Sequence, residues 1–248
     1  MIIDIQEERM LIISDLHIGN PFCDIKKDLV SFLNEAIDKG YSVCINGDGI
    51  DVMQTSLPTL TNELPVLLAA LRRFKEKGLS LYYVVGNHDL VFEKFLTSTS
   101  HFAFSPFLNL ESGGKRIRIE HGFLYDKNFV KNPQVYEFFV HLGGYFLKIL
   151  PAFYRLWIFY ENIKNGKNRK NTQHQGINGE APEFAKAAQV ILQRGFDSVV
   201  FGHTHHSGHV ELEQDQHYYN SGSFMLSYHY IKIENGEAEL ALWEKGSI

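Results

Sequence analysis

The sequence predicts a single domain with a mixed α/β fold. Residues 10–85 alternate short apolar runs with segments of helical periodicity, an order typical of parallel strands joined by helices. Residues 209–243 instead contain short strand-like runs that indicate antiparallel pairing. Five clusters rich in histidine and aspartate are spread from residue 15 to residue 205, and a domain boundary between them would separate side chains that we expect to act together. We therefore expect one domain over residues 1–248.

Strand-like and helical segments alternate in the first half of the chain. Three apolar runs have the length of buried strands, and the segments between them repeat apolar side chains every three or four residues, as helices do. Strands are expected at residues 10–14, 41–46 and 79–85, and helices at residues 24–39 and 63–77. This order predicts a sheet of parallel strands with helices packed over it.

The second half of the chain shows a different pattern. Apolar and polar residues alternate in one segment, and a four-residue apolar run has the character of a buried strand. Strands are expected at residues 116–120, 198–201, 209–219, 224–233 and 238–243, and a helix at residues 181–194. The last three strands are expected to be antiparallel, so the predicted fold is mixed.

Each of the five clusters follows a strand-like run. They are Asp15-Leu16-His17, Gly47-Asp48, Gly86-Asn87-His88-Asp89, His121-Gly122 and Gly202-His203-Thr204-His205. Open α/β sheets form their sites at the carboxyl ends of parallel strands, so we expect these clusters to meet at one edge. A single Asp-x-His or Gly-Asp pair occurs often by chance, whereas five such pieces, each at a strand end, indicate one site.

The clusters supply side chains that bind metal ions. Asp15 and His17 are separated by one residue, and at this spacing side chains of an extended chain point the same way, so the two can share an ion. The carboxylate of Asp48 is the candidate bridge between two ions. The other candidate ligands, one oxygen and three nitrogen donors, are Asn87, His121, His203 and His205.

The mixed oxygen and nitrogen donors predict a site for two divalent or trivalent metal ions. Mn is favoured, with Fe, Zn and Co as alternatives, over an all-oxygen Mg site. Two ions roughly 3.5–4 Å apart can hold a hydroxide that attacks phosphorus, while both ions neutralise phosphoryl oxygens. We expect His88 to assist the leaving group and Asp89 to orient His88.

A long insertion, expected to be helical, occupies residues 126–175. From Asp126 to Lys170 it contains eight basic and three acidic residues, although the whole chain has a formal net charge of −5. It is also rich in aromatic residues, and Lys148, Pro151 and Arg155 would interrupt a membrane-spanning helix.

Two interpretations of the insertion stay open. Its aromatic residues either pack against the body of the domain as a helical hairpin, or form a lid that grips an acyl chain or rests on a membrane surface. Basic residues beside an apolar groove would suit an anionic amphiphile. The candidate substrate-binding residues are Lys127, Lys131, Lys148 and Arg155.

Composition excludes some other classes of protein. A net charge of −5 argues against general nucleic-acid binding, which normally requires a basic surface. The two cysteines, Cys23 and Cys44, do not suggest a disulfide framework. The first residues lack the basic and long apolar segments of a secretory signal, so we expect a cytoplasmic protein.

The series Asp-x-His, Gly-Asp, Gly-Asn-His-Asp, His and Gly-His-x-His resembles the signature of the calcineurin-like metallophosphoesterase superfamily, over about residues 9–223. The resemblance implies two mixed sheets flanked by helices, a four-layer α-β-β-α sandwich with a helical insertion. It also implies a catalytic role for His88. One ion would take Asp15, His17, Asp48 and His205, and the other Asp48, Asn87, His121 and His203.

Within the superfamily, the layout is most similar to the UDP-2,3-diacylglucosamine diphosphatase branch, because a long insertion separates the His121 and Gly202 clusters. This implies cleavage of a pyrophosphate or phosphodiester bond in a nucleotide-linked or lipid-linked substrate. The branch has arginine where this chain has His88, so a general phosphodiesterase or phosphomonoesterase acting on small nucleotides or phosphoproteins is an alternative. A catalytically inactive scaffold of the same fold is another, against which the complete set of ligand candidates argues.

Overall fold

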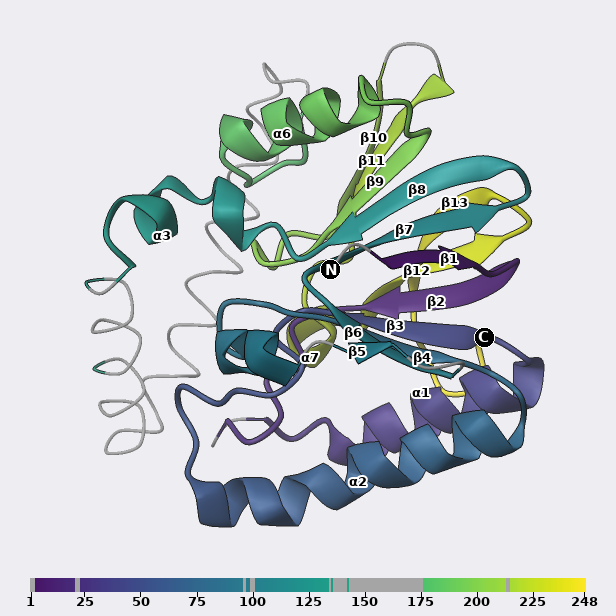
Figure 1. Cartoon of the computed structure of the whole chain (residues 1–248), viewed down its shortest axis with the longest axis vertical. Coiled ribbons are helices and arrows are strands. Elements are labelled where there is room, and N and C mark those ends of the chain that lie inside the picture. The colour runs from purple at the N-terminus through teal and green to yellow at the C-terminus, as the bar shows by residue number, and fades with distance from the viewer. Residues whose placement is uncertain are drawn as a thin grey trace.

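Two β-sheets are stacked face to face in the computed structural model of the chain, and helices cover their outer faces (Figure 1). The structure describes residues 3–20, 23–95, 97–98, 101–133, 135, 142, 176–212 and 215–248. Of the insertion expected at residues 126–175, only residues 126–133, 135 and 142 are described. For the other residues of the insertion, the prediction that they are helical lies outside the described residues.

The first sheet has six strands. In spatial order they are β1 (Ile3–Gln6), β7 (Phe107–Ser112), β8 (Lys115–Glu120), β9 (Ser198–Phe201), β11 (His217–Asn220) and β10 (Gly208–Glu211). β8, β9 and β11 run parallel, whereas β7 and β10 are antiparallel to their neighbours β8 and β11. The sheet is therefore mixed, as the resemblance implied.

The second sheet has seven strands. In spatial order they are β13 (Glu237–Leu242), β12 (His229–Glu234), β2 (Arg9–Ile13), β3 (Ser42–Asn46), β4 (Leu81–Val84), β6 (Phe102–Ser105) and β5 (Thr97–Ser98). β2, β3, β4 and β6 are parallel, which confirms the predicted β-α-β-α-β start. β12 pairs antiparallel with both β2 and β13, so the C-terminal part of the chain forms one edge of this sheet.

Helices form the two outer layers. α1 (Lys26–Lys39) and α2 (Leu57–Glu76) run along the outer face of the second sheet, and α6 (Pro182–Leu192) covers the first (Figure 1). One buried apolar cluster lies under α1 and α2, one between the sheets and one under α6. These clusters confirm the four-layer α-β-β-α arrangement. No helix in the described part of the chain is long and apolar enough to cross a membrane.

The remaining described helices are short. They are η1 (Leu90–Phe95), η2 (Phe123–Tyr125), α3 (Lys127–Lys131) and α7 (Phe224–Ser227). α7 corrects the strand expected at residues 224–233, which begins only at His229. The reason is a tertiary contact, because the N–H of Phe224 donates to the carbonyl of Ser14 and the chain turns through Tyr228 at φ 55°.

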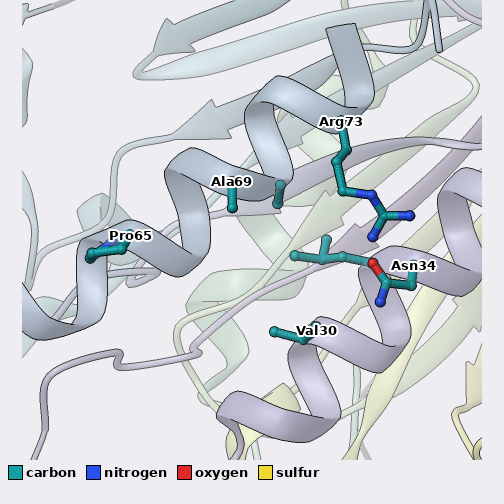
Figure 2. Close-up of a pocket in the computed structure, with 7 residues that line it drawn as sticks. Val30, Asn34, Pro65, Ala69 and Arg73 are labelled. Carbon is teal, nitrogen blue, oxygen red and sulfur yellow. The ribbon is translucent and has the colours of Figure 1, made fainter. Parts of the chain in front are cut away.

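A groove lies between α1 and α2 on the outer face of the molecule. Figure 2 shows Val30 and Asn34 of α1 opposite Pro65, Ala69 and Arg73 of α2. The groove has a volume of 320 Å³ and a mostly apolar lining. Small side chains on α2 leave this space open, and none of the lining residues belongs to the five sequence clusters.

A half-buried carboxyl group connects α6 to the first sheet. Glu180 lies just before α6 and accepts hydrogen bonds from the hydroxyls of Thr204 and Tyr218 and from the amide of Asn220, each at 2.7 Å. Burial raises the pKa of Glu180 to about 7, because removal from water disfavours the charged form more than these three donors stabilise it. Glu180 therefore titrates near neutral pH.

The raised pKa of Glu180 predicts a pH-dependent stability. The folded protein holds this proton up to about pH 7, whereas the unfolded chain releases it near pH 4.5, the usual pKa of a glutamate. The contribution is fully present below pH 4.5 and is lost as the pH rises through 7. Glutamine does not titrate, so Glu180→Gln should not lose this contribution. The free energy of unfolding of the variant minus that of wild type should therefore be roughly 1–2 kcal/mol larger at pH 8 than at pH 5. Urea unfolding in the presence of a chelator measures it, and parallel pH profiles for the two proteins would contradict it.

Candidate metal centre

The five clusters converge between the two sheets. Asp15 and His17 follow β2, Asp48 follows β3, and Asn87 and His88 follow β4. On the facing sheet, His121 follows β8, and His203 and His205 follow β9. Within the described part of the chain, three groups of side chains have ligand atoms within 4.8 Å of one another. They are Asp15, His17 and His205; His17, Asp48 and His88; and Asp48, His121 and His203. The groups share members, so they form one continuous cluster.

The backbone of the cluster is strained. Asp15, His17, Asp48, His203 and His205 have φ values of 54°, 48°, 51°, 65° and 60°. Residues with a side chain seldom adopt this left-handed conformation, and it concentrates at functional sites. The expectation that the first two residues lie on extended chain is therefore wrong. Their side chains meet because the loop turns, which brings the imidazole Nε2 of the histidine within 4.0 Å of the aspartate Oδ1.

The loops after β2 and β3 are held together by their backbones. The N–H of Asp15 donates to the carbonyl of Gly47 at 3.1 Å, and the N–H of His17 donates to the carbonyl of Asp48 at 2.9 Å. Ile18 and Ile50 continue this pairing as a parallel bridge. The two loops therefore fix the relative positions of the first two carboxylates of the cluster.

Glycine is required at two positions by close approach. A Cβ on Gly47, which has φ 82°, would lie 2.3 Å from the ring of His121. A Cβ on Gly86 would lie 2.2 Å from Oδ1 of Asp48. The Gly-Asp and Gly-Asn-His-Asp motifs therefore begin with glycine because neighbouring cluster residues fill the space of a side chain.

Three buried polar atoms of the cluster fit a cation. Asp15 Oδ1, His17 Nε2 and His121 Nε2 make no well-formed hydrogen bond among the described residues, and His205 Nε2 lies 3.1 Å from Asp15 Oδ1. His121 Nδ1 faces the Asn46 carbonyl at 2.8 Å, so the other ring nitrogen is left free, 3.3 Å from Oδ2 of Asp48. Buried polar atoms without partners are costly, and metal ions would satisfy oxygen and nitrogen donors gathered in this way.

The electrostatics of the cluster favour positive charge. Burial acts to raise the pKa of Asp48, but the imidazoles of His121 and His88 outweigh it and hold this pKa well below its usual range. Burial likewise acts to lower the pKa of His121, yet Asp48 and Asp15 raise it to about 10. The buried carboxylates therefore stabilise cationic charge at the centre of the cluster.

Asp51 is a functional candidate that the sequence analysis missed. Its Oδ1 lies 3.1 Å from Nδ1 of His88, and its Oδ2 lies 3.5 Å from Nδ1 of His17. The side chain is fully buried, and Asn20 donates to it at 2.9 Å. Its position three residues after Asp48 was the available signal. Asp51 therefore orients the His88 ring and lies beside the His17 ring.

The predicted role of Asp89 is wrong. Its carboxylate accepts hydrogen bonds from the N–H groups of Gly49 and Gly86 and from the hydroxyl of Tyr83. The turn that begins at Gly86 directs this side chain back toward β4, so it braces the loops, whereas the His88 ring contacts Asp51. Burial, together with the nearby Asp48 carboxylate, raises the pKa of Asp89 to about 7.

The remaining candidates are His203 and the basic residues of the insertion. His203 Nδ1 is 2.9 Å from Oδ1 of Asn87, and its Nε2 is 3.2 Å from Oδ2 of Asp126, which the sequence analysis did not select. Lys127 is paired with Glu183 of α6 at the surface. Of the other proposed substrate contacts, Lys131 is exposed on α3, whereas Lys148 and Arg155 lie outside the described residues.

Two solved structures with TM-scores of 0.50 or more have a similar fold. A dimetal phosphatase from Danio rerio is 11% identical, with a TM-score of 0.51 and coverage of 95% of this chain and 99% of that chain. GAP50, described as the anchor in the inner membrane complex of Plasmodium, is 12% identical, with a TM-score of 0.50 and coverage of 96% and 85%. Vps29 from Entamoeba histolytica, solved with zinc, is 13% identical, with a TM-score of 0.42 and coverage of 94% and 97%.

The family assignment rests on the sequence. No curated protein matches the chain, and the solved structures are too distant in sequence to show more than the fold. Residues 8–207, however, match the family described as calcineurin-like phosphoesterase, and this range contains all five clusters. The chain therefore belongs to the calcineurin-like phosphoesterase family, and it is a metal-dependent phosphohydrolase.

Proposed function

We propose that the chain hydrolyses phosphoester bonds with two metal ions held around Asp48. The observation that carries this proposal is the set of buried, unpartnered donor atoms of Asp15, His17 and His121, which converge beside that carboxylate. One ion would be held by Asp15, His17, Asp48 and His205, and the other by Asp48, Asn87, His121 and His203. Two such ions activate a water molecule for attack and neutralise phosphoryl oxygens.

His88 is placed to act on the leaving group. Its Nδ1 faces Asp51, so its Nε2 is the nitrogen left to face a substrate. The backbone N–H of His88 donates to Oδ1 of Asp48 at 2.8 Å, which fixes the ring beside the proposed bridging carboxylate. Burial acts to lower the pKa of His88, but Asp48 and Asp51 raise it to about 9. The ring can therefore carry a proton to the departing oxygen at Nε2.

For the substrate, we propose a pyrophosphate or phosphodiester bond in a nucleotide-linked or lipid-linked molecule similar to UDP-2,3-diacylglucosamine. The basic and aromatic composition of residues 126–170 supports this proposal. His88 in place of arginine favours the alternative, a general phosphodiesterase or phosphomonoesterase. Mn as the native metal, a cytoplasmic location and contact of the insertion with a membrane surface remain predictions from the sequence.

Three substrates tested side by side separate these alternatives. We expect the Mn-reconstituted protein to cleave UDP-2,3-diacylglucosamine faster than bis-p-nitrophenyl phosphate and p-nitrophenyl phosphate, because residues of the insertion would add binding energy for the larger substrate. Faster cleavage of either small substrate would support the alternative instead. No hydrolysis of any of the three, with two ions bound, would return the inactive scaffold to consideration.

The role of His88 can be separated from metal binding. His88→Ala should lower kcat by about 100-fold or more, the usual contribution of a general acid, while two metal ions remain bound. Steady-state kinetics and elemental analysis of the same preparation measure both quantities. His209→Ala, at an exposed position on β10, is the matched control and should change neither. Loss of metal without loss of turnover in the His88 variant would show that His88 serves metal binding and not the leaving group.

The shared carboxylate should be essential for both ions. Asp48→Ala removes the one side chain that both proposed ligand sets contain, so the metal content should fall from two ions per chain to near zero. Elemental analysis after dialysis checks this, with Asp215→Ala as a control at an exposed aspartate. Retention of one tightly bound ion in the Asp48 variant would show that the carboxylate is not shared.

A further inference from the structure

The loop that carries His203 and His205 needs support from outside. Both residues have left-handed backbones, and a strained conformation of this kind persists only where the surrounding structure holds it in place. On one side, Glu180 accepts a hydrogen bond from the hydroxyl of Thr204, the residue between the two histidines. On the other side, the carboxylate of Asp126 contacts the His203 ring.

The two nitrogens of the His203 ring have different neighbours. Nδ1 lies 2.9 Å from Oδ1 of Asn87, and both atoms belong to the set proposed for the second ion. Nε2 lies 3.2 Å from Oδ2 of Asp126, on the opposite edge of the ring. A histidine that binds a metal through one nitrogen commonly donates the other N–H to a carboxylate, which fixes its tautomer and ring orientation. The geometry at His203 matches that arrangement.

We propose that Asp126 is a positioning residue for His203. Its Oδ2 accepts the Nε2–H of the ring, so that the unprotonated Nδ1 faces Asn87 and the second metal position. The inference rests on the proposed dinuclear site. It gives Asp126, at the start of the insertion, a role in metal affinity and not in substrate contact.

Asp126 is itself held firmly. Its other oxygen, Oδ1, accepts the N–H of Asn128 at 2.8 Å and so caps α3. Phe129 of α3 is buried, with its ring 5.1 Å from that of Phe123, and this packing holds α3 in place. The carboxylate therefore links the position of α3 to the orientation of the His203 ring.

The test separates the two contacts of Asp126. Asp126→Ser keeps a good helix cap but is too short to reach the His203 ring. We expect its affinity for the second Mn ion to fall 10–100-fold, as is typical for loss of an outer carboxylate, while the first ion binds as in wild type. Mn titration followed by electron paramagnetic resonance distinguishes single ions from coupled pairs. Glu183→Gln, which breaks the surface pair of α3 with α6, is the matched control and should bind two ions normally.

The possible outcomes discriminate between the hypotheses. If wild type fails to bind a coupled pair of ions, the proposed function fails. If wild type binds the pair and Asp126→Ser binds it equally tightly, the inference about Asp126 is overturned.

Should the serine variant not fold, Asp126→Asn decides, because it keeps the cap and the shape but loses the charge. It should still bind the second ion several-fold more weakly, and wild-type affinity would contradict the inference. In zinc-loaded wild type, ¹⁵N spectra should show a protonated Nε2 on His203.

Discussion

Burial of two carboxylates at strained chain reversals is the constraint on which the rest of the structure depends. Asp15 and Asp48 are almost fully buried, and each has a left-handed backbone. Strain of this kind costs about 1–3 kcal/mol for each residue. The surrounding sheets must therefore hold these loops in conformations that the loops would not adopt alone, and cations of the centre would relieve the charge that is buried there.

The sandwich holds the loops from two directions. Parallel pairing of β2 with β3 brings the first two loops together, and their own backbones then pair beyond the strand ends. From the facing sheet, the hydroxyl of Ser221 lies 2.8 Å from that of Ser14, and the hydroxyl of Ser223 donates to the carbonyl of Asp15. The turn after β11 is thus a structural clamp between the sheets, and the hydrogen-bonding groups of these serines serve that contact.

The sequence predicted the parallel core and the positions of the clusters, because apolar runs and strand-end motifs are local signals. The reversal at Asp15 and His17 was not predictable in this way, since its cause is pairing with a loop more than thirty residues away. α7 was not predictable either, because it forms where the N–H of Phe224 donates a hydrogen bond to the distant carbonyl of Ser14. The short strand β1 was also missed, because it is defined by pairing with β7 about a hundred residues later.

Among side chains, the sequence identified those whose chemistry recurs in a motif and missed those that act by contact alone. Asp89 is adjacent to His88 in sequence but turns away, whereas Asp51 reaches the ring from another loop. Asp126 was counted only as one acid within a basic segment. Neighbourhood in sequence is a poor guide to which carboxylate orients an imidazole, because backbone turns decide where each side chain points.

The two residues that contact the His203 loop lie at the ends of the insertion, since Asp126 begins it and Glu180 follows it. The entry and exit of the inserted segment are therefore anchored a few residues apart on one rigid turn. The entropy of closing a loop grows only slowly with its length. A segment inserted at this point can therefore change in length or composition during evolution while both sheets stay intact. Substrate specificity can change in this way without a change in the metal centre.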